Sequence, residues 1–169
     1  GGSAVEDFDG DGLMDIVVSS WGLFDPLRYF RNAGDGTFSE RTEQAGLSGQ
    51  IGGLNIEQAD YDNDGDVDLL VLRGAWMGEE GRIPNSLLRN GGDGTFVDVT
   101  RQSGLFTRHP SNSAAFADYD NDGWLDLFVG NESGRQPHAC QLFRNRGDGT
   151  FIDVASSLGL DHVGFVKGV

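Results

Sequence analysis

The residues best suited to chemistry in this chain are aspartates that recur in three copies of the pattern Asp-x-Asp-x-Asp-Gly-x-x-Asp. The copies supply Asp7, Asp9, Asp11 and Asp15, then Asp60, Asp62, Asp64 and Asp68, then Asp118, Asp120, Asp122 and Asp126. Four carboxylates within nine residues repel one another, and a bound cation would cancel that repulsion. Ca²⁺ accepts about six to eight oxygen ligands in a flexible geometry and prefers carboxylates and backbone carbonyls. The pattern therefore predicts three Ca²⁺ sites, one in each copy.

The spacing separates these sites from the EF-hand, the helix–loop–helix calcium motif. The glycine at position six permits a sharp bend in both, and by analogy position seven offers a backbone carbonyl to the ion. That position holds Leu13, Asp66 and Trp124. An EF-hand also needs a glutamate at position twelve, where this chain has Val18, Val71 and Val129. We therefore expect the sites to lie in loops between strands.

The elements that must position these loops are short strands. Apolar runs follow each motif at residues 16–18, 69–72 and 127–129, and they are rich in β-branched or aromatic residues. Runs of this kind are typical of buried strands. The fourth aspartate of each motif is therefore expected at the start of a strand.

A second repeated segment indicates a β-hairpin after each of these strands. Residues 29–38, 87–96 and 142–151 share an apolar start, Arg-Asn, a Gly-Asp-Gly turn and a Thr-Phe restart. Glycine supplies the positive φ that tight turns require. We interpret Asp35, Asp93 and Asp148 as turn formers and not as metal ligands.

The period of the motifs predicts the architecture. The first aspartates of successive motifs are 53 and 58 residues apart, and each interval has room for four short strands but no long helix. Such a repeat indicates a β-propeller blade, which must stack on its neighbours to bury its faces. We expect an all-β chain of three four-stranded blades, at about 1–50, 51–108 and 109–163. Residues 164–169 would begin a fourth repeat.

These motifs resemble the FG-GAP/VCBS-type calcium-binding propeller repeats. The pairing of Asp-Tyr-Asp-Asn-Asp-Gly with Leu-Phe-Arg-Asn-x-Gly-Asp-Gly-Thr-Phe is similar to cartilage acidic protein-like proteins and, more distantly, to integrin α-subunit propellers. The resemblance covers nearly the whole chain. It implies a propeller that is usually seven-bladed, with calcium held by the motif aspartates. The Phe-Gly and Gly-Ala-Pro tripeptides of the integrin repeats are not present, so integrin-like ligand binding is not implied.

The composition of the chain gives information about its cellular location and its binding partners. The formal net charge is −15, but twelve of the 27 acidic residues are motif aspartates. Three Ca²⁺ would leave a charge of about −9. An acidic surface disfavours nucleic acid, whose phosphates are bound by Lys and Arg. Loops that need abundant calcium suit an extracellular or periplasmic location, and we expect a secreted protein without a membrane span.

The one cysteine, Cys140, allows no intrachain disulfide.

Two classes of function are consistent with these features. The first is a calcium-stabilised scaffold, without catalytic activity, that mediates adhesion by binding a protein or a glycan, or that packs against other chains or the rest of a parent propeller. The second is a platform or accessory arm of an extracellular enzyme whose catalytic residues lie outside this chain. The strong motifs all serve metal and fold, which favours the first class. Trp21, Trp76 and Trp124 would either pack between blades or stack on a sugar.

Overall fold

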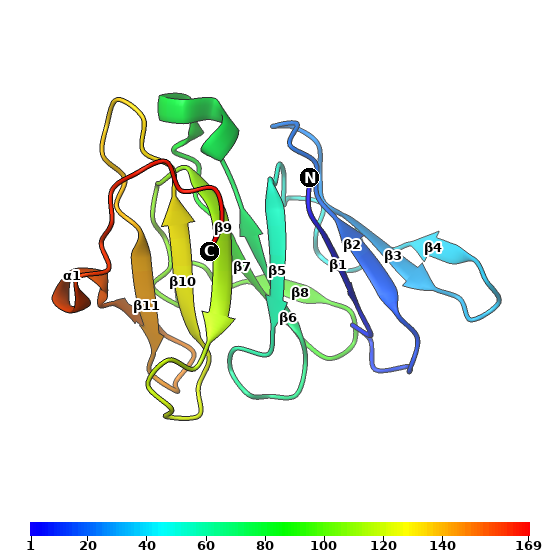
Figure 1. Ribbon diagram of the computed structural model, residues 1–169. Helices are drawn as coiled ribbons and strands as arrows, with labels where there is room; N and C mark the ends of the chain where they lie inside the picture. The colour runs from blue at the N-terminus through cyan, green and yellow to red at the C-terminus, as the bar shows by residue number, and fades with distance from the viewer.

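Three antiparallel sheets of four strands make up the computed structural model, which describes residues 1–169 apart from the side chain of Glu79. Each sheet is formed by consecutive strands, so each is one blade (Figure 1). The first blade contains β1 (Ser3–Glu6), β2 (Asp15–Val18), β3 (Arg28–Asn32) and β4 (Phe38–Glu40). The second contains β5 (Asn55–Ala59), β6 (Asp68–Leu72), β7 (Ser86–Asn90) and β8 (Phe96–Asp98). The third contains β9 (Ser111–Ala117), β10 (Asp126–Asn131), β11 (Gln141–Asn145) and β12 (Phe151–Asp153).

The predicted fold class is confirmed: the chain is nearly all-β and its repeats are four-stranded blades. The fourth aspartate of each motif is the first residue of β2, β6 or β10, as the sequence predicts. Two short helices accompany the strands, the 3₁₀ helix η1 (Ala75–Gly81) and the single turn α1 (Ala155–Leu158). Among the described residues, no helix has the length and apolar character needed to cross a membrane.

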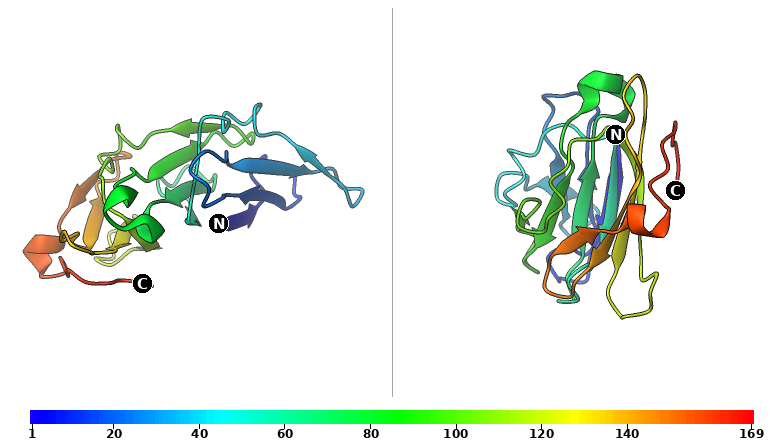
Figure 2. Two further views of the ribbon diagram at one scale, coloured as in Figure 1. Left: turned by 90° about the horizontal axis from the view of Figure 1, so that it is seen from above. Right: turned by 90° about the vertical axis from the view of Figure 1, so that its left-hand side faces the viewer.

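The blades fan out in an arc with their first strands side by side on the inner face (Figure 2). Strand β5 contacts both β1 and β9, and the side chain of Gln58 exchanges hydrogen bonds with the backbone of Val5. Residues 164–169 run along the inner face of the third blade, where Asn112 Nδ2 donates to the carbonyl of Val166 at 3.1 Å.

The hydrophobic cores lie between blades. One core joins the first two blades through residues such as Phe8, Tyr29 and Phe96, whose rings meet edge-on at centroid distances of 5.6–6.3 Å. The second core joins blades two and three, where the Tyr61 and Phe151 rings lie 5.7 Å apart. A blade is therefore stabilised mainly by burying its apolar faces against its neighbours.

A repeated hydrogen bond joins the second blade to the first and the third blade to the second. Asn90 Nδ2 donates to the carbonyl of Phe8 in the first blade at 3.0 Å, and Asn145 Nδ2 donates to the carbonyl of Tyr61 in the second blade at 2.8 Å. Both asparagines are 2% exposed. These side chains belong to the Arg-Asn pair of the repeated hairpin, so the hairpin motif also carries the contact between blades.

Candidate metal centres

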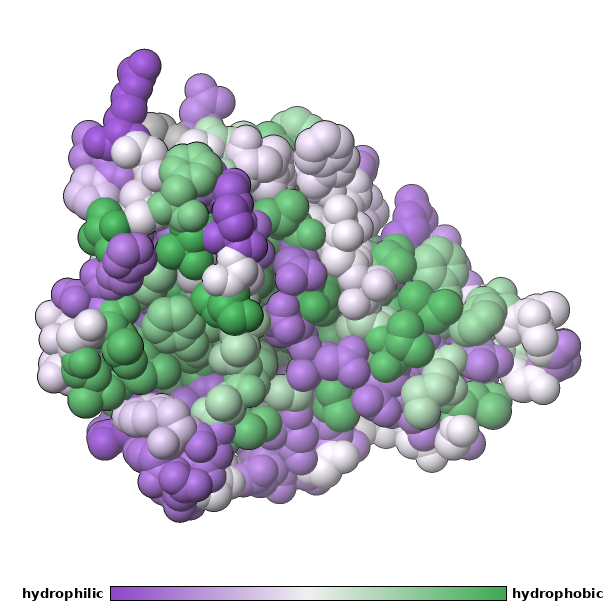
Figure 3. All heavy atoms as spheres, in the orientation of Figure 1, coloured by the Kyte–Doolittle hydropathy of each residue, from purple (hydrophilic) through white to green (hydrophobic). Residues whose placement is uncertain are grey.

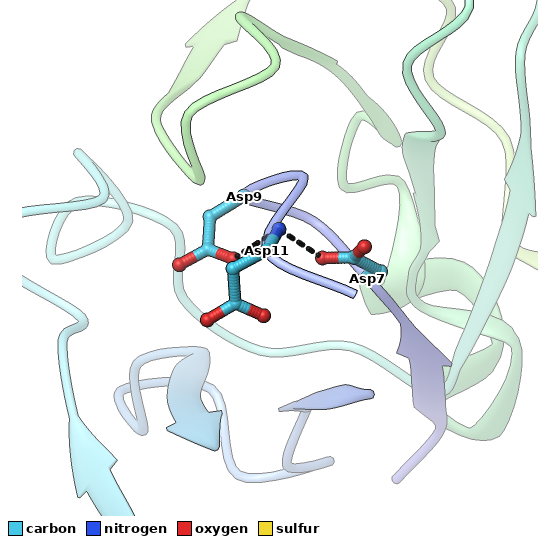
Figure 4. Close-up of side chains that lie close together, drawn as sticks. All are labelled: Asp7, Asp9 and Asp11. Carbon is cyan, nitrogen blue, oxygen red and sulfur yellow. Dashed lines mark hydrogen bonds between the residues drawn. The ribbon is translucent and has the colours of Figure 1, made fainter. Parts of the chain in front are cut away.

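Three clusters of aspartates lie in the loops that join the first two strands of each blade. In every cluster, three carboxylates place oxygen atoms within 4.8 Å of one another. The clusters are Asp7, Asp9 and Asp11; Asp60, Asp62 and Asp68; and Asp118, Asp120 and Asp122. Figure 4 shows the first cluster, in which the carboxylates of Asp7 and Asp9 both accept from the backbone nitrogen of Asp11. The structure therefore brings together most of the aspartates that the sequence singles out.

The first aspartate of each motif shapes its loop. Both carboxylate oxygens of Asp7 accept backbone N–H groups, from Asp11 at 3.0 Å and from Gly12 at 2.7 Å. Asp60 and Asp118 accept the equivalent pairs of N–H groups. The glycine at position six has φ near 90° in every loop, a conformation that glycine adopts without steric cost. These constraints turn the backbone around the carboxylates.

The position-seven residue packs on the neighbouring hairpin turn. A Cβ added to Gly34, Gly92 or Gly147 would fall 3.1 Å or less from the side chain of Leu13, Asp66 or Trp124 respectively. The first glycine of each Gly-Asp-Gly turn thus leaves room for this side chain. Trp124 therefore packs against the hairpin turn of its own blade, whereas Trp21 is 63% exposed. The proposal that the position-seven carbonyls bind metal stays a prediction.

The fourth aspartate of each motif is buried and fixes the start of its strand. Asp15, Asp68 and Asp126 are at most 1% exposed. Each accepts a backbone N–H from the asparagine of the following hairpin, at 2.7 Å from Asn32 and 2.8 Å from both Asn90 and Asn145. Asp68 also belongs to the second cluster, whereas Asp15 and Asp126 are outside the clusters formed by the other aspartates.

The clusters satisfy two conditions for holding Ca²⁺, the spacing and the type of their oxygen atoms. Two oxygens that both lie within coordination distance of one Ca²⁺ are separated by at most about 5 Å, and the oxygens of each cluster meet this limit at 4.8 Å. The donors are hard carboxylate oxygens, the type that Ca²⁺ prefers. In the second loop, Asp62 Oδ1 is buried without a hydrogen-bond partner, which is costly unless a cation satisfies it. The residues present therefore fit calcium.

Burial raises the pKa of two carboxyl groups in the second cluster, those of Asp68 and Asp62. Desolvation raises the pKa of Asp68 to about 8, and the charges of Asp62 and Asp64 contribute to the same effect. Burial and the neighbouring Asp64 also raise the pKa of Asp62. Without a cation, the Asp68 carboxyl group is therefore mostly protonated at neutral pH.

The first loop differs because an arginine of β3 reaches it. Arg31 Nε donates to Asp9 Oδ2, and one terminal nitrogen of the same guanidinium lies 2.5 Å from Asp11 Oδ2. Arg89 and Arg144 occupy the same position of the hairpin motif in the other repeats, but the ion pairs of the described side chains include neither of them. The recurring Arg-Asn pair was the sequence signal for this contact, although the hairpin pattern alone gave no reason to connect it with the loop.

The hairpin aspartates act as turn formers, as their position in the motif predicts. Asp35 Oδ1 accepts from both the backbone nitrogen and the hydroxyl of Thr37, at 3.0 and 2.6 Å. Asp93 and Asp148 make the same pair of bonds with Thr95 and Thr150. The threonine bonds lower the pKa of each of these carboxyl groups.

Comparison with known proteins agrees with the geometry. The sequence profile of the family described as FG-GAP-like repeat matches residues 7–71, 75–129 and 118–166. Cartilage acidic protein 1 of Homo sapiens is 40% identical over 75 residues, which are 43% of this chain and 11% of the human protein. The Mus musculus protein is 32% identical over 120 residues, which are 70% of this chain and 18% of the mouse protein. The matched segment thus spans less than a fifth of these curated relatives.

One solved structure is partly similar to this chain. Its title describes specific recognition of non-reducing terminal N-acetylglucosamine by a lectin of Agrocybe aegerita. The similarity has a TM-score of 0.49 and 23% identity, and it covers 88% of this chain and 36% of that one. Similarity at this level carries no argument about function.

Proposed function

This chain belongs to the FG-GAP-like repeat family, and we propose that it is a calcium-stabilised propeller scaffold that binds a protein or glycan partner outside the cell. Its role is binding and not catalysis. The ions are structural: they neutralise the motif carboxylates and hold each loop between the first two strands of a blade.

The observation that carries this proposal is the threefold clustering of carboxylate oxygens within 4.8 Å. The candidate ligands are Asp7, Asp9 and Asp11; Asp60, Asp62 and Asp68; and Asp118, Asp120 and Asp122. The motif adds Asp15, Asp64 and Asp126 and the three position-seven carbonyls as further candidates. Bound ions would supply positive charge at the sites where a chain of net charge −15 has its densest negative charge.

An extracellular location follows from the same requirement for calcium. Extracellular modules use sites with dissociation constants of about 0.1–1 mM, because the ion is abundant there. A secreted scaffold of this kind keeps its loops occupied without high intrinsic affinity. Repeat folds of stacked blades provide broad surfaces between and above the sheets, which suits adhesion to a protein or glycan.

Calcium titration calorimetry on the whole chain tests the metal assignment. We expect binding of three Ca²⁺ per chain, and the variants D9N, D62N and D120N should each lose one equivalent. D35N is the matched control, because Asp35 belongs to a hairpin turn, and it should retain all three. Absence of calcium binding at millimolar concentration, or equal losses in D35N and D62N, would refute the assignment.

A further inference from the structure

A pocket on the second blade has chemistry that the repeat does not require. It has a volume of about 420 Å³ and lies where the start of β7 and the segment after β8 meet residues 49–51 of the preceding repeat. Pockets at equivalent places on the first and third blades are smaller, at about 210 and 330 Å³. Volumes above roughly 300 Å³ are typical of small-ligand sites.

The floor of the second-blade pocket contains a buried arginine, Arg73, which is 5% exposed. Its guanidinium donates to the carbonyls of Ile51 and Pro84 and to the side chains of Gln50 and Ser86, at 2.8–3.1 Å. These four bonds leave one of the five guanidinium N–H donors for a ligand. Burial lowers the pKa of Arg73 to about 10, so a bound anion would relieve an unfavourable position of this charge.

A second arginine and an aromatic ring form the rim. Arg101 lines the pocket, and its guanidinium carbon lies 3.6 Å from the centroid of the Phe106 ring, which lines it too. Stacking on an aromatic ring orients a guanidinium without using its N–H donors. The pocket therefore presents two positive charges, one fixed by hydrogen bonds and the other by an aromatic contact.

One carboxylate shares the pocket with these arginines. Asp98 Oδ2 accepts from Gln50 Nε2 at 2.9 Å, and Asp98 Oδ1 accepts from the Thr100 hydroxyl at 2.6 Å. Asp98 Oδ1 also accepts from the backbone nitrogen of Thr100 at 3.0 Å, so both of its acceptor sites are used. Besides Gln50, Asp98 Oδ2 has only a long contact of 3.5 Å with the Ser86 hydroxyl, so this oxygen can accept one further hydrogen bond. A ligand that fits must offer an anionic group to the arginines and a hydroxyl donor to Asp98 Oδ2.

Arg73, Arg101 and Phe106 are each replaced by a different type of residue at the same place in the other two repeats. Counting from the motif aspartates, Arg73 takes the place of Ser20 and Asn131 in the other repeats. Counting from the hairpin phenylalanines, Arg101 replaces Glu43 and Ser156, and Phe106 replaces Ser48 and Asp161. Because the other blades form without Arg101 and Phe106, blade packing does not account for these two side chains, whereas Arg73 also bonds residues 50 and 51 of the preceding repeat. In a chain with 12 basic and 27 acidic residues, two arginines against one aspartate make this pocket locally positive.

We propose that this pocket binds a hydroxylated carboxylate of monosaccharide size, with the carboxylate between Arg73 and Arg101 and one hydroxyl group on Asp98 Oδ2. The proposal rests on the proposed function as a binding scaffold and names the chemistry of a ligand for it.

Titration calorimetry of the calcium-loaded chain with D-glucuronate, and with D-glucose as the neutral control, tests the proposal. We expect saturable binding of glucuronate and at least roughly tenfold weaker binding of glucose, because charged hydrogen bonds distinguish the two. The R101Q variant should weaken glucuronate binding by a similar factor. R135Q removes an exposed arginine of the third blade and should leave glucuronate binding unchanged.

A second measurement distinguishes loss of ligand binding in the pocket from loss of calcium-dependent stability of the whole chain. Calcium-dependent stabilisation, measured by thermal unfolding of the same samples, should be equal in the wild type, R101Q and R135Q. No glucuronate binding in a chain that calcium still stabilises would overturn the pocket proposal alone. Equal affinities for glucuronate and glucose, or equal losses in R101Q and R135Q, would also overturn it.

Discussion

Individual side chains make the three loops unequal, although their motifs are nearly identical. Arg31 pairs with Asp9 and Asp11 in the first loop, whereas the second loop keeps a buried Asp62 oxygen without a partner. An arginine already bound to the carboxylates competes with a metal ion for the same oxygens. We therefore expect the first loop to be the weakest of the three calcium sites and the second to gain most from an ion.

Replacement of Arg31 by glutamine should strengthen calcium binding at the first loop. The Arg31 side chain is 37% exposed, so solvent screens the pair and the gain should not exceed about fivefold. Stepwise calorimetric titration should show the weakest of three steps shifting to lower calcium concentration.

R89Q and R144Q are the matched controls, because these arginines hold the same place in the motif. Neither should tighten the weakest step. Identical titrations for R31Q, R89Q and the wild type would show that Arg31 does not compete with the ion.

Calcium binding should release protons near neutral pH. The pKa of Asp68 is raised to about 8 in the ion-free protein, so at pH 7 its carboxyl group is mostly protonated, and a bound cation favours the deprotonated form. Release should approach one proton per chain at pH 7 and vanish as the pH rises above 8 towards 9.5, where Asp68 is already ionised. Calorimetric titrations in two buffers of different ionisation enthalpy measure this number; a value near zero at pH 7 would contradict the raised pKa.

Strands and hairpins depend on a few polar residues as much as on their apolar faces. The Asn90 and Asn145 side chains each bond a carbonyl of the preceding blade. Asn32 occupies the same place in the first blade, but its Nδ2 donates to the carbonyl of Met14 within that blade. Asn90 and Asn145 also make the equivalent bond within their own blades, to the carbonyls of Val67 and Leu125. The bond to the neighbouring blade is therefore an additional contact of these two asparagines.

This difference provides a matched pair of variants. N90A should lower the free energy of unfolding by about 1–3 kcal/mol, because it removes the buried hydrogen bonds from Asn90 Nδ2 to the carbonyls of Phe8 and Val67. N32A should cost clearly less, since Asn32 is more exposed and its side chain does not bond another blade. Urea unfolding in saturating calcium measures both. Equal losses would mean that the bond between blades adds nothing to stability.

The strands, the hairpin turns and the clustering of the loop aspartates could be predicted from the sequence, because each recurs in three copies. The repeats fix the start of β2, β6 and β10 at an aspartate. The pairing of Arg31 with the loop could not be predicted, because it depends on a side-chain conformation that Arg89 does not share. Helix η1 occupies residues 75–81, within the longer interval of 58 residues between motifs, and no repeated pattern marks it. His109 and His138, which are 29 positions apart, meet at 2.9 Å, and spacing along the chain does not indicate this contact.

The molecule as a whole exposes two complementary aromatic positions on its outermost blades. Phe38 is 46% exposed, whereas its counterparts Phe96 and Phe151 are each 6% exposed against a preceding blade. Tyr119 is 41% exposed, whereas its counterpart Tyr61 is 2% exposed beneath the next blade. Apolar side chains gather over the first and third blades in Figure 3 as well. Each end of the arc thus presents one half of the interface that joins the blades internally.

The isolated chain should therefore self-associate through its end blades. Sedimentation velocity should show concentration-dependent association of the wild type, and the double variant F38S/Y119S should reduce it. V97S is the control, because Val97 is 57% exposed on β8 of the middle blade, and it should associate like the wild type. A wild-type chain that stays monomeric at high concentration would show that these faces do not pair.

Thermal unfolding of the chain in millimolar calcium and in EDTA tests the central claim, that calcium holds the three loops together, most directly. Each site that is filled at a hundredfold excess over its dissociation constant adds about 2.7 kcal/mol of stability. The melting temperature should therefore be markedly higher in calcium than in EDTA, and the difference should shrink in D62N and again in D62N/D120N. Magnesium at the same concentration should stabilise less, because it demands a stricter octahedral geometry. Identical melting curves in calcium and in EDTA would contradict the account.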